Sequence, residues 1–99
     1  MPADPLAMVV EFRAVPGKVD ELRAALLGIV GPSRAEDGCV RYDLHTDRED
    51  ADVLAFYEVW ESVEAHAAHD RTAHIEHLRT VLPGLVAERR VLRMTPIEP

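Results

Sequence analysis

Cysteine is almost absent from this chain of 99 residues, which contains only Cys39. A single thiol forms no internal disulfide, and it excludes the cysteine-rich class of zinc sites. A free thiol is typical of a reducing compartment. Residues 1–12 contain two prolines but neither a basic segment nor a long apolar run, so they indicate no secretion signal and no membrane span. We therefore expect a cytoplasmic protein.

Basic charge is also scarce. The chain has 11 Lys and Arg against 18 Asp and Glu, which gives a net charge of −7. Its densest basic group is Arg89, Arg90 and Arg93, and Glu88 and Glu98 dilute it. Nucleic acid and anionic membrane both require a concentrated basic face. We therefore expect neither as a partner, and a solvated strand edge accounts for these arginines.

Repeats, low-complexity tracts, phosphate-binding glycine loops, nucleotide fingerprints and nucleophile motifs are all missing from the sequence. Ninety-nine residues make one domain, so we assign residues 1–99 to a single unit with residues 1–6 as a loose lead-in. A domain of this size buries roughly two-thirds of its unfolded surface, so its core is modest. A partner chain would enlarge that core.

Apolar residues recur with period 2 or with steps of three and four, and the pattern changes at turn residues such as Pro16-Gly17 and Asp37-Gly38. The alternating order predicts strand, helix, strand, strand, helix, strand. This is a ferredoxin-like βαββαβ arrangement of the α+β class, with an antiparallel sheet covered by helices on one face. The predicted elements are strands 7–15, 39–45, 53–60 and 86–95, a helix from 18 to about 35, and two short helices over 62–69 and from 70 or 72 to 82.

The strand over residues 53–60 is apolar on both sides. One side carries Leu54, Phe56 and Trp60 together with Glu58, and the other carries Val53, Ala55, Tyr57 and Val59. A sheet buried on both faces needs a cover on each. Helices cover one face, and the simplest cover for the other is a second copy of the sheet. The sequence therefore predicts a homodimer.

Four of the five histidines follow Trp60 within the helical region 62–82, at positions 66, 69, 74 and 77. Histidine is the side chain best suited to proton transfer near neutral pH, so we expect a pocket between strand 53–60 and this region. Metal binding would need three or four converging ligands. The helical positions of these histidines do not favour four-way convergence, and we predict no metal site. Without further information, partly exposed histidines that assist helix ends remain an alternative.

Glu58 lies among apolar residues, and a buried carboxylate needs a partner, for which Arg13 and Arg41 are the candidates. An ion pair and a catalytic base are both compatible with the pattern. Trp60, Tyr57 and Tyr42 are either core residues or walls for a planar ligand, because an aromatic ring packs in both settings.

Three segments together resemble the antibiotic biosynthesis monooxygenase domains, a family that includes small quinol monooxygenases. They are Pro16-Gly17-Lys18, the passage SRAEDGCVRYDLH at 33–45, and YEVWES at 57–62 followed by His69 and His74. The resemblance spans roughly residues 8–95. It implies a dimeric α+β barrel, with a ligand cavity between each sheet and its own helices. Its best-known members oxygenate phenols or quinols with O2 and use no metal, haem or flavin.

The resemblance implies a cofactor-independent monooxygenase in which His69 or His74 is the base. Phe56, Tyr57 and Trp60 would position the substrate ring, and Arg41 or Arg13 would balance charge. His66 departs from the apolar residue usual in the family, and we expect it to pack in the core. In the haem-degrading branch of the family the iron ligand falls where this chain has Arg79, which cannot bind iron. An isomerase and a non-enzymatic ligand-binding module of the same fold are the alternative functions.

Overall fold

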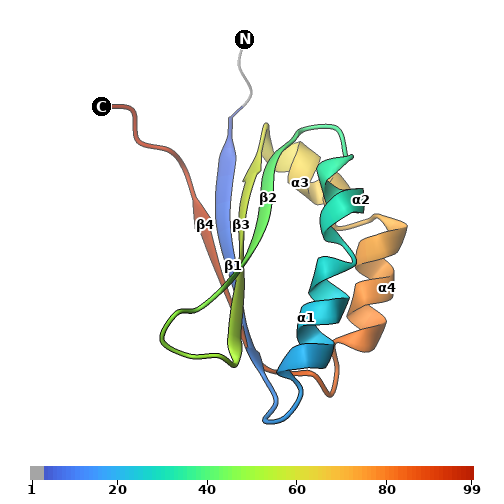
Figure 1. The fold of residues 1–99 in the computed structure, drawn as a ribbon. Helices are drawn as coiled ribbons and strands as arrows, with labels where there is room; N and C mark the ends of the chain where they lie inside the picture. Colours follow the sequence, from blue (N-terminus) through green and yellow to red (C-terminus); the bar gives the residue numbers. More distant parts are fainter. Residues whose placement is uncertain (1–3) are drawn as a thin grey trace.

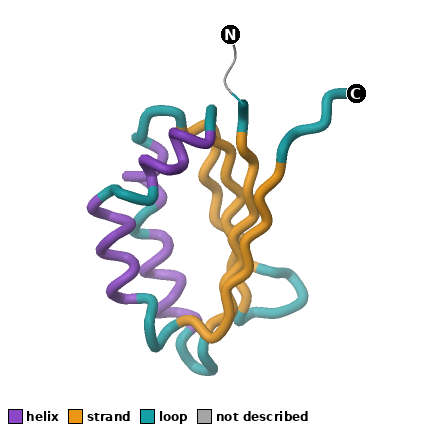
Figure 2. Tube along the Cα trace, turned by 180° about the vertical axis from the view of Figure 1, so that it is seen from behind, coloured by secondary structure: helices purple, strands orange, loops and turns teal. Residues whose placement is uncertain are grey.

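Four strands form one antiparallel sheet with helices on one of its faces, in the computed structural model that describes residues 4–99 (Figure 1). Seen from behind, the same chain shows the helical layer separated from the strand layer (Figure 2). The elements of the described residues, in chain order, are β1 (Leu6–Ala14), α1 (Val19–Leu27), α2 (Val30–Arg34), β2 (Cys39–Thr46), β3 (Val53–Trp60), α3 (Val63–His69), α4 (Ala73–Val81) and β4 (Val86–Met94).

The strand order is β2-β3-β1-β4, with β1 antiparallel to both of its neighbours. This order confirms the predicted ferredoxin-like α+β fold, in which two split strand-helix-strand units interleave. The predicted lead-in was one residue too long, because β1 already begins at Leu6 and this residue is buried. Residues 1–3 of that lead-in lie outside the described residues.

The helix predicted from residue 18 to about 35 is two helices, and the prediction of one continuous element was wrong. Helix α1 ends at Leu27 and α2 begins at Val30, so the break falls at Gly28 and Ile29. Pro32 is the physical reason, because proline lacks the N–H that a continuous helix would need and its ring clashes with the preceding turn. The restart places Pro32 in the first turn of α2, where proline is tolerated. The second helix then packs against β2.

Side chains on the helix-facing side of the sheet make the core. Met8, Val10 and Phe12 from β1 are buried there, as the period-2 pattern predicts. On β3 the helix-facing set is the one that contains Phe56 and Trp60. Strict alternation along β2 would place Val40 on the same face as Tyr42, but the Val40 side chain is 58% exposed. An irregularity in the pairing between Cys39 and Arg41 shifts the alternation at this position.

The other face of the sheet carries apolar side chains together with charged ones such as Arg13, Arg41 and Arg90, and no element among residues 4–99 covers it. Ala7 and Val53 are nevertheless buried by their neighbours, whereas Tyr57 and Leu92 are exposed. None of the helices in the described part of the chain combines the length and apolar character needed to cross a membrane.

Candidate functional site

A cavity of about 640 Å³ lies between the sheet and the helices α3 and α4. Its floor is apolar and comes mainly from the two central strands, with Met8, Val10 and Phe12 on β1 and Phe56 on β3. Ile75 and Leu78 of α4 form the opposite wall. Phe12 and Phe56 meet edge to face with ring centroids 6.4 Å apart. Such a slot suits a planar apolar ligand, because flat rings gain most from contact with aromatic walls.

Titratable side chains gather at one end of this cavity. Pairing of β2 with β3 places Tyr42 beside Glu58. His66 and His69 of α3 line the same part of the cavity from the helical side. Burial raises the pKa of Glu58 above its ordinary value, against the opposing effect of the hydrogen bond from Trp60. Burial also raises the pKa of the Tyr42 hydroxyl, which therefore stays protonated. The pKa of His66 is lowered, chiefly by burial. This end of the cavity therefore favours neutral forms of all three groups.

Helix α3 is held close to the sheet by its first residues. The Ser62 hydroxyl accepts a hydrogen bond from the Ala65 amide at 3.0 Å and so caps the N-terminus of the helix. Gly38 has a φ of +83°, and a Cβ built there would lie 2.6 Å from the Cβ of Ala65. Only glycine allows this approach. The Glu61 amide also donates to the Gly38 carbonyl at 2.8 Å. These contacts bring the face of α3 that bears His69 onto the sheet.

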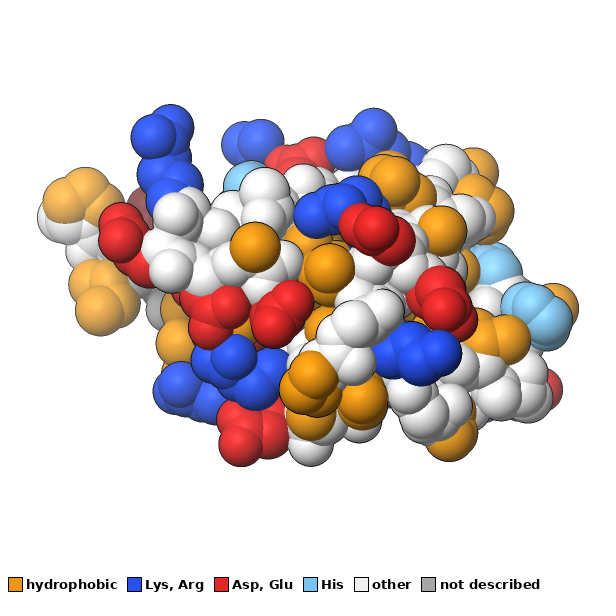
Figure 3. Space-filling model, turned by 60° about the horizontal axis from the view of Figure 1, so that its bottom comes forward, with side chains coloured by type: hydrophobic (Ala, Val, Ile, Leu, Met, Phe, Trp, Pro, Cys, Tyr) orange, Lys and Arg blue, Asp and Glu red, His pale blue; other side chains and the backbone are white. Residues whose placement is uncertain are grey.

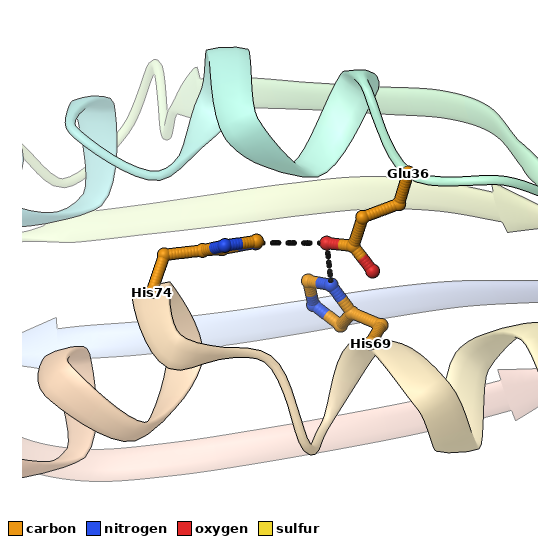
Figure 4. Close-up of side chains that lie close together, drawn as sticks. All are labelled: Glu36, His69 and His74. Carbon is orange, nitrogen blue, oxygen red and sulfur yellow. Dashed lines mark hydrogen bonds and ion pairs between the residues drawn. The ribbon is translucent and has the colours of Figure 1, made fainter.

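One carboxylate binds two of the histidines. Glu36, in the connection between α2 and β2, points at His69 from α3 and His74 from α4 (Figure 4). Its Oε2 atom lies 2.7 Å from Nδ1 of His69 and 2.8 Å from Nε2 of His74. A carboxylate oxygen only accepts hydrogen bonds, so both of these nitrogens donate. The remaining ring nitrogen of His69, Nε2, lies 3.4 Å from the Tyr42 hydroxyl.

The Glu36–His69–His74 cluster therefore fixes the tautomer of a buried imidazole. With Nδ1–H of His69 committed to Glu36, the neutral ring presents the lone pair of Nε2 beside Tyr42. His69 is 3% exposed and lines the cavity. The cluster thus leaves a proton acceptor at Nε2 beside Tyr42, with a carboxylate on the other nitrogen of the same ring.

The same three residues are a candidate cation site, since each offers one ligand atom and these atoms lie within 4.8 Å of one another. Two ligand atoms on a tetrahedral zinc ion are about 3.3 Å apart, given zinc–ligand distances near 2.0 Å. The oxygen-to-nitrogen distances of 2.7 and 2.8 Å are shorter than that and are those of charge-assisted hydrogen bonds. A zinc ion would therefore require these side chains to move apart.

Of the residues predicted from the sequence, Phe56 and His69 line the cavity. Trp60 and His74 do not. Trp60 is fully buried behind His69, with ring centroids 4.6 Å apart, and its Nε1–H donates to Oε1 of Glu58 at 2.9 Å. His74 contacts the same oxygen of Glu36 as His69 does, but its side chain is not among those that line the cavity. His66 is buried as predicted, with 8% of its surface exposed, and it also lines the cavity.

Tyr57 and Arg41 lie on the opposite face of the sheet, so the structure does not bring them to this cavity. Alternation along β3 and β2 turns both away from the helices, and the Arg41 guanidinium lies over the Tyr57 ring at 6.0 Å. Arg41 pairs with Asp43 instead.

Arg13 is on the outer face as well, and it pairs with Asp50. The predicted ion pair of Glu58 with Arg13 or Arg41 is therefore wrong, and Trp60 is the partner that Glu58 uses.

Glu36 is the site residue that the sequence reasoning missed. It is the glutamate of the SRAEDGCVRYDLH passage, so the signal was present in a segment already singled out. Tyr42, in the same passage, was left open between core and ligand contact, and it lines the cavity. Arg89 and Arg93 were assigned to a solvated strand edge, yet both line the cavity too.

Residues 5–81 match the family model described as antibiotic biosynthesis monooxygenase. A Mycobacterium tuberculosis protein, Rv0793, whose name gives it as a candidate monooxygenase, is 32% identical over 95 residues, which cover 96% of this chain and 91% of that protein. A Synechocystis protein, sll1783, is 27% identical over 94 residues, and this chain spans only 64% of its length.

The crystal structure of PA3566 from Pseudomonas aeruginosa superposes with a TM-score of 0.95 at 30% identity, and it covers 99% of both chains. SO0527 from Shewanella oneidensis superposes with a TM-score of 0.90 at 29% identity, covering 94% of this chain and 91% of its own. These matches show a shared fold over nearly the whole chain.

Proposed function

The chain belongs to the antibiotic biosynthesis monooxygenase family, and on that premise we propose that it is a cofactor-independent monooxygenase that oxidises an aromatic or quinol-type small molecule with O2. The observation that carries the proposal is the placement of His69. Its imidazole ring lines an apolar cavity, and the Nδ1 atom of that ring is hydrogen-bonded to the Glu36 carboxylate. A general base and an aromatic slot are what a phenolic substrate needs.

In the proposed reaction the substrate ring lies against Phe12 and Phe56, and its hydroxyl faces Nε2 of His69. The imidazole takes the phenolic proton, and Glu36 stabilises the resulting positive charge. The Tyr42 hydroxyl, which stays protonated because burial raises its pKa, donates to the phenolate oxygen.

The electrons come from the substrate. A phenolate gives one electron to O2, and the ring radical and superoxide combine into a peroxide anion with a new C–O bond. The His69 imidazolium then returns its proton to this anion, which becomes a hydroperoxide. Loss of water then leaves a quinone. One O2 and one phenol thus give one quinone and one water, so the balance requires no external reductant.

We also propose that the protein acts as a homodimer. The outer face of the sheet carries apolar side chains, among them Val9, Tyr57 and Leu92, and two sheets of this kind bury each other when they pack face to face. The dimeric α+β barrel implied by the family has this arrangement. Sedimentation equilibrium of the protein and of a Leu92→Lys variant measures the association directly, and a monomeric wild type would contradict it.

Oxygen consumption with a panel of hydroquinones and naphthols tests the proposed activity. His69→Gln keeps a donor for Glu36 but cannot take the proton, so it should slow O2 uptake at least tenfold in a folded protein. His69→Ala should do the same. His77→Gln is the matched control, since this histidine on α4 is exposed. EDTA treatment should leave the rate unchanged. An undiminished rate in His69→Gln would refute the role of this residue.

Acid–base isomerisation without O2 is the second candidate, because the cavity holds a carboxyl with a raised pKa beside an oriented imidazole. Turnover of an oxygenated metabolite under anaerobic conditions would favour it over the oxygenase. A binding module would instead show thermal stabilisation by the ligand and no turnover under either atmosphere.

A further inference from the structure

Strand β4 supplies the cavity with two arginines from its helix-facing side. Register pairs Arg89 with Phe12 and Arg93 with Met8, so both side chains leave the sheet on the same face as the apolar floor. Val91 lies between them, opposite Val10. The Arg89 guanidinium carbon lies 5.9 Å from the centroid of the Phe12 ring. The cavity therefore has a cationic edge along β4.

Neither arginine is used in an ion pair. Within the described residues, six of the 11 basic side chains have a carboxylate oxygen within 4.0 Å, and Arg89 and Arg93 are not among them. The third arginine of the cavity, Arg79, is paired with Asp70 at 3.6 Å. Arg90, the remaining arginine of this cluster in the sequence, pairs in register with Glu11 on the outer face.

The charge balance of the cavity is opposite to that of the chain. Two carboxyl groups line it, Glu58 and Asp70, against the three arginines. Asp70 is already matched by Arg79, and burial raises the pKa of Glu58 and so favours its neutral form. The chain as a whole carries a net charge of −7, and acidic and basic side chains are interspersed on the face that Figure 3 presents. Of the five basic side chains among residues 4–99 without a carboxylate partner, Arg89 and Arg93 are therefore the two that line the apolar cavity, and both are exposed at its edge.

We propose that Arg89 and Arg93 form an anion subsite at the β4 edge, and that the substrate is a phenol or quinol ring that carries a carboxylate. The proposal rests on the proposed function and narrows its substrate class. A guanidinium matches a carboxylate with two parallel hydrogen bonds, whereas the floor formed by Val10, Phe12 and Phe56 offers the ring only apolar contact.

The dimensions of the sheet agree with such a ligand. Glu58 and Arg93 both pair with Met8, on its two sides, so two strand spacings of about 4.8 Å separate them. The acid–base end and the arginine edge are thus about 10 Å apart at the backbone. A fused bicyclic ring bridges this span with its hydroxyl toward His69 and its carboxylate toward β4.

Equilibrium binding of redox-inert probes tests the subsite without any turnover. The probes are 2-naphthoate and its neutral isostere 2-naphthamide, titrated by calorimetry into the full chain at low salt. We expect the carboxylate to bind at least tenfold more tightly than the amide. The double variant Arg89→Gln/Arg93→Gln should lose this preference and keep its affinity for the amide. Arg89→Lys/Arg93→Lys, which retains the charges, should keep part of the preference.

Arg90→Gln is the matched control, because it removes the same charge from the outer face of the same strand. It should leave the preference intact. Equal affinities of the wild type for the two probes, no binding of the carboxylate at millimolar concentration, or an equal loss in the Arg90→Gln variant would each overturn the subsite. The proposed oxygenase activity is tested separately, by O2 uptake with neutral hydroquinones. Absence of that uptake would contradict the activity and would not affect the binding result.

Discussion

Replacing Glu36 with Gln removes one negative charge from between two imidazoles and keeps an oxygen that accepts hydrogen bonds. The side chain is held 2.7 Å from His69 and 2.8 Å from His74, with only 13% of its surface exposed. If Glu36 acts by stabilising the protonated form of His69, the variant should bind substrate normally and turn it over slowly. Glu36 would then be a positioning residue that acts through the base.

The size of the effect follows from the hydrogen bond. A bond to a charged partner contributes about 1.5–3 kcal/mol and a neutral one about 0.5–1.5 kcal/mol, so the change weakens the protonated state by about 1–1.5 kcal/mol. A barrier change of about 1.4 kcal/mol is a factor of ten in rate. We therefore expect Glu36→Gln to lower kcat about tenfold with little change in KM. Glu36→Ala should lower kcat about a hundredfold, because it leaves buried donors without an acceptor.

The assay is steady-state O2 uptake with the best substrate of the panel. His74→Ala is the control, since water can replace this donor to Glu36 at a side chain that is 22% exposed. We expect its rate to stay within about threefold of the wild type, because a water molecule that donates to Glu36 is nearly as favourable as the direct hydrogen bond. A loss in His74→Ala as large as in His69→Gln would restore His74 as a candidate base.

A double-variant cycle decides whether Glu36 works through His69. In the His69→Gln background the further change Glu36→Gln should have no effect on the residual rate, because the base it supports is gone. Multiplicative losses would show that the two residues act independently. That result would refute the reasoning, even if each single variant were slow.

Two further predictions concern stability. Burial raises the pKa of Glu58, so the protonated form stabilises the fold at low pH, and this contribution is lost as the pH rises through the raised pKa. Glu58→Gln, which can still accept from Trp60, should therefore raise the melting temperature at pH 8 and raise it much less at pH 5. Equal differences at both pH values would contradict this prediction. Gly38→Ala should lower the free energy of unfolding in urea by more than about 2 kcal/mol, since it adds a clash with Ala65 to the backbone strain. Gly17→Ala, at φ +82° with nothing within 4 Å, should lower it by only about 1 kcal/mol. Equal losses in the two variants would show that the contact between Gly38 and α3 is unimportant.

Local pattern determined most of the architecture. Alternation identified the four strands, and the side of β3 that bears Phe56 and Trp60 proved to be buried under the helices. Those periods follow from the geometry of a single strand or helix, so they can be read from neighbouring residues. Two departures were also local in cause. Pro32 broke a helix that the apolar pattern alone continued, and the irregular pairing after Cys39 turned Val40 outward.

The site depended on contacts between distant segments. Glu36 lies 33 positions from His69 and 38 from His74, and nothing in the spacing of these residues shows that one carboxylate oxygen binds both rings. Parity alone separated the two faces of β3 but left open which one carried the cavity. For that reason Tyr57 and Arg41 were assigned to a site that lies on the other side of the sheet.

The amino-acid order by itself thus determined the four strands, the order of strands and helical regions along the chain, and the family, because these depend on short-range periodicity and on motifs of a few residues. Only the packed structure decided that His69 reaches the cavity while Trp60 stands behind it, and that the arginines of β4 face the apolar floor. The physical reason is that strand register and helix placement are set by the burial of whole faces at once. The residues next to a position along the chain therefore do not show which residues contact it across the sheet.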